Sequence, residues 1–137
     1  MNSYLISYVL NLHHNYFNKN KMELITLKVL QNIIHYSLHF FAPLCIALFF
    51  FKKDWKNVYL IFLSTMLVDL DHLFANPIFD ANRCSIGFHY LHSFYFIVVY
   101  FLVLFFSKNK KIKLIAAGLI FHMATDFQDC LWLNYLK

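Results

Sequence analysis

The stretch VYLIFLSTMLVDLDHLF, Val58–Phe74, joins a long apolar run to Asp69, Asp71 and His72. An α-helix needs about 20 predominantly apolar residues to cross the hydrocarbon core of a bilayer, and this run approaches that length. Hydrocarbon cannot satisfy exposed backbone polar groups, so such a segment is predicted to be helical. The three polar side chains at its end need a separate explanation, because ionisable residues inside a membrane are costly.

Three more apolar segments of similar length accompany this stretch: Asn32–Phe51, Phe88–Phe106 and Leu114–Leu133. The chain is 61% hydrophobic and 14% charged, whereas soluble domains are nearer half apolar and a quarter charged. We therefore predict an all-α fold, an integral membrane bundle of four transmembrane helices. Residues 22–137 would form this domain and residues 1–21 a short polar N-terminal extension. Met22 is an alternative start to Met1.

Lysines dominate the basic residues and cluster in two connecting loops. The segments KKDWK (Lys52–Lys56) and KNKKIK (Lys108–Lys113) hold seven lysines between the first and second and the third and fourth predicted spans. Loops rich in Lys and Arg stay in the cytoplasm, so both loops are predicted inside and both termini outside. Short lysine runs of this kind indicate membrane lipid as a partner rather than nucleic acid.

The three cysteines, Cys45, Cys84 and Cys130, show no metal-site spacing. We interpret them as apolar filler. A Cys84–Cys130 bridge is the alternative.

Polar residues inside the predicted spans form one layer. Six of the eight histidines and four of the seven acidic residues lie there: His35, His39, Asp69, Asp71, His72, His89, His92, His122, Asp126 and Asp129. Within each span the spacings of three, four or seven residues correspond to one helix face, with Asp71 off this stripe. Because the spans alternate in direction, all groups fall in the same half of the membrane, the outer half. His13 and His14 are predicted to be solvated tail residues.

A divalent metal would explain this layer. An Asp at the centre of a membrane helix costs about 2.5–3.5 kcal/mol, and the predicted spans contain no Lys or Arg to neutralise four of them. Mixed imidazole and carboxylate ligands favour Zn, with Mn or Fe as alternatives. Ten candidates exceed one tetrahedral shell, so we predict one or two ions. The predicted ligands are His35, His39, Asp69, His72, His89, His92, His122 and Asp126.

Four motifs carry a resemblance to known families: HYSLHF (His35–Phe40), DLDHL (Asp69–Leu73), HYLHS (His89–Ser93), and His122 with Asp126 four residues later. The chain resembles the membrane-bound metal-dependent hydrolases, which include the LexA-binding, inner-membrane-associated predicted hydrolases. From Met22 onward it is more similar to a smaller family of four-span bacterial membrane proteins of unknown function. The resemblance implies a bacterial inner (cytoplasmic) membrane location. It also implies metal or catalytic roles for Asp69, Asp71, His72, His89, His92, His122 and Asp126. The chain departs from the larger family where no arginine follows His89.

These observations favour a metal-dependent hydrolase that acts on a lipid-like ester or phosphodiester. Asp71 or Asp129 would accept a proton. Arg83, the only arginine, would bind a substrate phosphate through its guanidinium group. The alternatives are a non-enzymatic transition-metal-binding or transport protein, a bis-His haem protein and a His-rich di-iron lipid oxidase. The sequence alone leaves open whether the chain is an enzyme.

Overall fold

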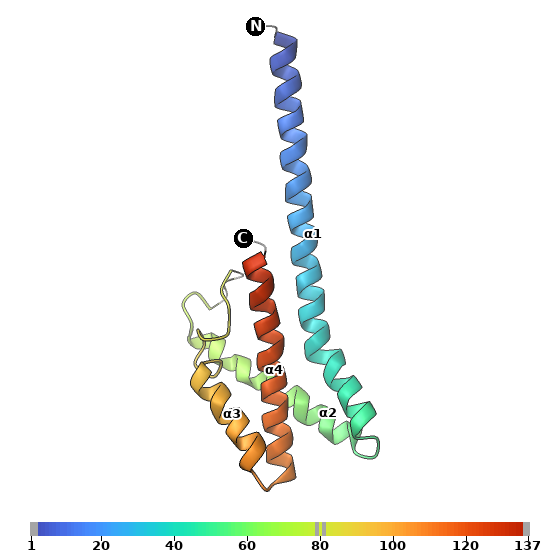
Figure 1. Cartoon of the computed structure of the whole chain (residues 1–137), viewed down its shortest axis with the longest axis vertical. Helices are drawn as coiled ribbons and strands as arrows, with labels where there is room; N and C mark the ends of the chain where they lie inside the picture. The colour runs from blue at the N-terminus through green and yellow to red at the C-terminus, as the bar shows by residue number, and fades with distance from the viewer. Residues whose placement is uncertain (1–2, 79, 81, 136–137) are drawn as a thin grey trace. The chain divides into compact units, whose positions relative to one another are not determined.

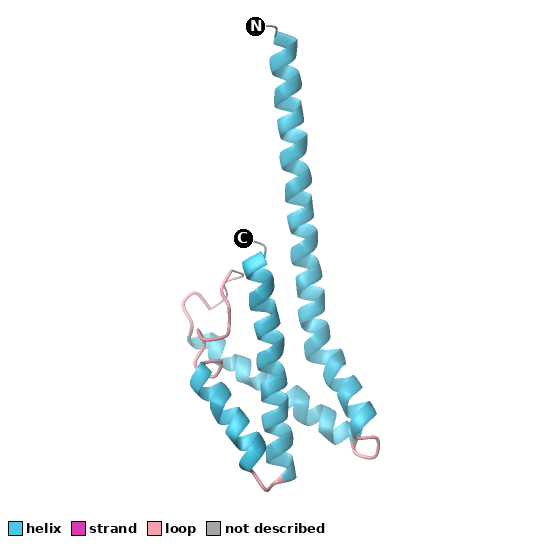
Figure 2. Cartoon of the chain, in the orientation of Figure 1, coloured by secondary structure: helices cyan, strands magenta, loops and turns pink. Residues whose placement is uncertain are grey.

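The chain is helical throughout most of its described part. A computed structural model describes residues 3–78, 80 and 82–135 (Figure 1). The elements in order are α1 (Ser3–Phe50), α2 (Trp55–Ser64), the 3₁₀ helix η1 (Thr65–Phe74), α3 (Phe94–Phe106) and α4 (Lys110–Tyr135). The described residues contain no strand (Figure 2), which confirms the predicted all-α class. The chain divides into two compact units, Met1–Ile33 and Ile34–Lys137.

Two helical stretches are long and apolar enough to cross a membrane, Lys21–Phe50 and Trp55–Phe74. The second consists of α2 followed directly by η1, and the larger rise of a 3₁₀ helix gives it a length of about 35 Å, close to the hydrocarbon thickness. Helix α3 is apolar but has only 13 residues, or about 20 Å. Two stretches of the described chain therefore have the length and composition of a membrane span. The bundle of four spans stays a prediction.

The predicted helix Phe88–Phe106 starts six residues too early. The helix begins at Phe94, so His89 and His92 do not share a helix face but lie in the turns before α3. The Gly87 N–H donates to the His92 carbonyl at 3.0 Å, and Gly87 has a φ of +81°, which glycine adopts without steric cost. Asp71 accepts the backbone N–H of Leu91 at 2.7 Å. The Leu91 N–H therefore bonds to a side chain 20 residues away and not to a carbonyl within a helix. An apolar run in the local sequence cannot indicate such a contact.

Helix α4 is the centre of the unit formed by residues 34–137, because it packs against α2, η1 and α3 (Figure 1). Two small apolar clusters line this packing: Ala47, Val58 and Phe62 form one, and Val68, Tyr100 and Met123 form the other. A Cβ atom at Gly118 would lie 2.8 Å from the Thr65 Cγ2 atom. Glycine at this position therefore permits α4 to approach the junction of α2 and η1.

Polar side chains occupy much of the interior, and large apolar side chains cover the surface. Among residues with described burial, nine polar or charged and eight hydrophobic side chains are buried. Leu67, Leu70 and Phe74, by contrast, are 65%, 56% and 91% exposed. Soluble domains bury mainly apolar residues and rarely bury charged ones. In this chain, by contrast, polar and apolar residues are buried in nearly equal numbers, and many large apolar side chains are exposed.

A disulfide joins Cys84, in the loop before α3, to Cys130, near the end of α4. The interpretation of these two cysteines as apolar filler is wrong, and the alternative pairing is confirmed. Cys45 is free and exposed. Sequence spacing did not indicate the bridge, because 46 residues separate its cysteines.

Removal of this disulfide is expected to destabilise the fold. In the chain-entropy model, opening a cross-link across 46 residues lowers the free energy of unfolding by roughly 4 kcal/mol. The double variant Cys84→Ser/Cys130→Ser should show this loss in chemical unfolding in detergent micelles, followed by tryptophan fluorescence. Cys45→Ser is the control and should unfold like the parent. Equal stability of the double variant and the parent would show that the cross-link does not contribute.

Candidate metal centre

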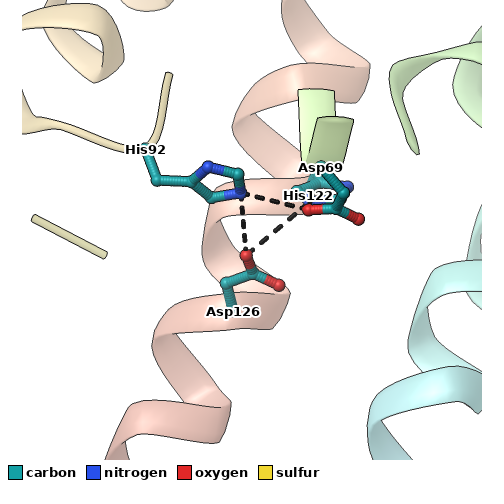
Figure 3. A group of neighbouring side chains, drawn as sticks. All are labelled: Asp69, His92, His122 and Asp126. Atoms are coloured by element: carbon teal, nitrogen blue, oxygen red, sulfur yellow. Dashed lines mark hydrogen bonds and ion pairs between the residues drawn. The ribbon is translucent and has the colours of Figure 1, made fainter. Parts of the chain in front are cut away.

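Four side chains from three parts of the fold converge on one point (Figure 3). Asp69 comes from η1, His92 from the turns before α3, and His122 and Asp126 from successive turns of α4. The α4 pair is four residues apart, so helix geometry alone places both side chains on one face. We call this group the first site.

The distances within the first site match those between ligands of one metal ion. The Asp69 Oδ1 atom lies 3.3 Å from His92 Nε2 and 3.1 Å from His122 Nε2. The Asp126 Oδ2 atom lies 3.1 Å and 3.6 Å from the same two nitrogens. In a tetrahedral zinc site with metal–ligand bonds of 2.0–2.1 Å, neighbouring ligand atoms are about 3.3–3.4 Å apart. The four side chains could therefore hold a metal ion.

Three of the four side chains of the first site are buried, and the fourth is partly exposed. His92, His122 and Asp126 are 0%, 1% and 5% exposed, whereas the Asp69 side chain is 36% exposed. The His92 Nε2 atom is buried and makes no hydrogen bond among the described residues, although two carboxylates lie nearby. A buried polar atom without a hydrogen bond is costly. A shared cation would satisfy it.

Asp71 holds His92 in the orientation that the first site needs. Its Oδ2 atom lies 3.0 Å from His92 Nδ1 and accepts the Leu91 N–H, while its Oδ1 atom lies 3.1 Å from His72 Nδ1. With the carboxylate as acceptor, Nδ1 carries the proton and Nε2 is left to bind a metal. A carboxylate behind a metal-binding histidine is a common arrangement. Asp71, predicted as a proton acceptor, thus has contacts typical of a positioning residue.

The carboxylates around His92 also favour a positive charge at this position. Burial disfavours the imidazolium form, but the carboxylates of Asp126, Asp69 and Asp71 outweigh burial and raise the pKa of His92 to about 10. In the metal-free site, His92 is therefore protonated at neutral pH. A metal ion would replace this proton.

His72 and His89, both predicted ligands, border the first site. Their rings stack with centroids 3.6 Å apart, and His72 Nε2 lies 3.3 Å from the Ser85 hydroxyl. Burial and the neighbouring His72 ring lower the pKa of His89 to about 4, so its imidazole is neutral. Asp71, His72 and His92 form a further group whose ligand atoms lie within 4.8 Å of one another.

His35 and His39 approach the first site from α1. The His39 Nε2 atom lies 3.3 Å from Asp126 Oδ1, and the pair is almost completely buried. His35 Nδ1 lies 4.0 Å from the Asp129 Oδ2 atom. Both histidines therefore lie beside acidic residues of α4.

Arg83 is held by backbone groups of its own loop. Its guanidinium group donates to the carbonyls of Pro77 and Ile78 at 2.8 and 3.1 Å, and it lies over the Phe88 ring at 4.5 Å. These contacts brace the loop before α3. The predicted contact of Arg83 with a substrate phosphate stays a prediction.

Sequence analysis missed two residues that support the site. Ser85 contacts His72, and the Tyr100 hydroxyl donates to the Leu91 carbonyl at 3.0 Å. Neither residue has a spacing that marks it, because both contacts depend on how the loop folds. Ser85 follows Cys84 directly, so recognition of the disulfide would have drawn attention to this loop.

Comparisons with known proteins identify a family but no activity. No curated protein and no solved structure matches the chain significantly. The relationship to membrane hydrolases and the bacterial origin stay predictions. Residues 29–133, which include every residue of the first site, match DUF6122, a family of unknown function, and the chain belongs to this family.

Proposed function

We propose that this chain is a membrane-embedded metal-dependent hydrolase that acts on a lipid-like ester or phosphodiester. The observation that carries the proposal is the first site. Its four ligand atoms come from η1, α4 and the turns before α3, and lie 3.1–3.6 Å apart in the four measured nitrogen–oxygen pairs. Two imidazoles and two carboxylates favour zinc, with manganese or iron as alternatives.

Different residues of the chain would position the ligands, bind the metal and accept a proton in such a centre. When bound, a divalent transition metal polarises a substrate oxygen and lowers the pKa of water. Asp71 keeps the His92 Nε2 atom available by accepting the proton of Nδ1. Asp69 is the partly exposed member of the first site, so water and a substrate would reach the metal beside it. Both Asp71 oxygens are engaged by histidines and by the Leu91 N–H, so Asp71 acts in this proposal as a positioning residue. Asp129 stays a predicted proton acceptor.

The surface supports a membrane location. Leu60, Leu67 and Leu73, spaced along the Trp55–Phe74 stretch, are each more than 60% exposed. Contiguous exposed apolar surface marks a protein or membrane contact. In the two stretches of membrane-spanning length, only 17% and 28% of the most apolar window is buried, whereas the core helix of a soluble protein would be mostly buried. A lipid-like substrate fits a site within such surroundings.

Two independent features support our proposal that the site lies in the outer half of the bilayer. Lysines of the 108–113 run begin α4, and Cys130 lies near its other end, about 30 Å away along the helix. Lysine-rich loops favour the cytoplasm, and disulfides form in oxidising compartments. Figure 1 shows the two lysine-bearing connections at one end of the 34–137 unit and the cysteine-bearing loop toward the other. His122 and Asp126 lie nearer the cysteine end.

Hydrolysis by the purified protein tests the proposal. In detergent micelles, the parent should hydrolyse a long-chain p-nitrophenyl ester or bis(p-nitrophenyl) phosphate. Chelation with 1,10-phenanthroline should stop the reaction, and added Zn²⁺ or Mn²⁺ should restore it. Asp69→Asn and His122→Ala should each lower the rate at least about 100-fold, as removal of one strong electrostatic contact does in other enzymes.

Asp54→Asn, a carboxylate in the exposed turn before α2, is the matched control and should keep the parent rate. A parent protein that holds metal but hydrolyses neither substrate class would contradict the hydrolase. That result would favour a non-enzymatic transition-metal-binding or transport protein.

A further inference from the structure

A second group of ligand atoms lies against the first site. His35, His39 and Asp126 each offer one atom, and these atoms lie within 4.8 Å of one another. His35 and His39 are four residues apart on α1, so their side chains share one helix face, and their ring centroids are 4.5 Å apart. The His39 and His122 rings are also 4.5 Å apart, which makes the two groups adjacent.

Asp126 belongs to both groups through different oxygens. Its Oδ2 atom lies 3.1 Å from His92 Nε2 in the first site, and its Oδ1 atom lies 3.3 Å from His39 Nε2. A carboxylate that directs one oxygen to each of two imidazole clusters is suited to bridge two cations. Two-metal centres hold their ions about 3.5–4 Å apart, which a single bridging carboxylate can span.

His35 supplies a second observation. Its Nδ1 atom is buried and makes no hydrogen bond among the described residues. The Asp129 Oδ2 atom is 4.0 Å away, which is an ion-pair distance but is beyond hydrogen-bond distance. If His39 and Asp126 formed only a structural ion pair, this neighbouring nitrogen would stay buried without a hydrogen bond. A cation in the second group would give the His35 imidazole a partner.

The formal charge of the polar layer also favours two metal ions. The polar layer holds four carboxylates: Asp69, Asp71, Asp126 and Asp129. The segments 58–74, 88–106 and 114–133, which carry them and most of the histidines, contain no Lys or Arg. One divalent ion would leave a formal charge of about −2 beside neutral imidazoles, and two ions would balance the four carboxylates. Charges in a poorly hydrated environment are costly unless they are paired.

We propose that a second divalent transition-metal ion binds His35, His39 and Asp126, so that Asp126 bridges a dinuclear centre. This second site rests on the proposed function only through the shared Asp126, and it does not require hydrolysis.

Manganese binding to the full-length protein in detergent tests the second site. Equilibrium dialysis should give two Mn²⁺ ions per chain for the parent, and electron paramagnetic resonance should show an exchange-coupled pair. His39→Ala should bind one Mn²⁺ with an uncoupled six-line spectrum, because the first site remains. His14→Ala, a histidine far from both sites in sequence, is the matched control and should bind two coupled ions.

His39→Gln, which keeps more of the side-chain volume, is measured beside His39→Ala, with helix content from circular dichroism as the folding check. A folded His39 variant that still binds two coupled ions overturns the second site. A parent that binds one ion also overturns it but leaves the proposed function standing. A parent that binds none removes both.

Discussion

Asp126→Ala is expected to weaken metal binding by this chain more than about 100-fold. The side chain provides Oδ2 to the first site and faces His39 with Oδ1, so one substitution removes a ligand from both groups. Structural zinc sites bind with about 10–16 kcal/mol. Loss of one ligand in four should therefore cost roughly 3 kcal/mol, which weakens Kd more than 100-fold.

Metal content after gel filtration in detergent, measured by mass spectrometry, checks this result. Asp54→Ala removes a carboxylate from an exposed turn and should retain the metal content of the parent. Circular dichroism separates loss of metal from loss of fold. A folded Asp126→Ala protein with parental metal content would be incompatible with the centre described above.

Metal affinity is expected to rise steeply with pH. The pKa of His92 in the metal-free site is about 10, so its imidazole is protonated between pH 6 and 8. Binding through Nε2 must expel that proton. The apparent Kd should therefore fall about tenfold for each unit of pH increase in this range, and the dependence should end above pH 10.

Competition with a chromophoric chelator at several pH values measures this slope, once the chelator's own protonation is taken into account. Proton release on metal addition, followed in a weakly buffered solution, gives a second readout of the same event. An apparent Kd that does not change between pH 6 and 8, with no proton released, would show that His92 is not a ligand.

Local periodicity correctly grouped the residues that lie on regular helices. His35 and His39 on α1, and His122 and Asp126 on α4, share faces as their four-residue spacing predicts, because α-helix geometry decides those positions. The depth argument, based on alternating spans, also brought Asp69 to the same layer. These predictions depend only on helix period and chain direction.

Contacts between distant residues decided what the sequence pattern missed. The apolar run from Phe88 predicts one helix, but the Asp71 carboxylate binds the Leu91 N–H and the preceding turns carry His92 into the first site. The 3₁₀ winding of η1 places Asp71 about 120° from Asp69 rather than about 160°, closer than the α-helical spacing suggested. The residue pattern of one segment predicts neither the Asp71–Leu91 contact nor the 3₁₀ winding.

X-ray absorption of the purified protein tests the central claim most directly, because it reports both the presence of a metal and the atoms bound to it. We expect one or two transition-metal ions per chain, with zinc bound by four to five nitrogen and oxygen atoms at about 2.0–2.1 Å and no sulfur at about 2.3 Å. A protein purified without chelators that contains no transition metal and takes up neither Zn²⁺ nor Mn²⁺ would contradict the claim.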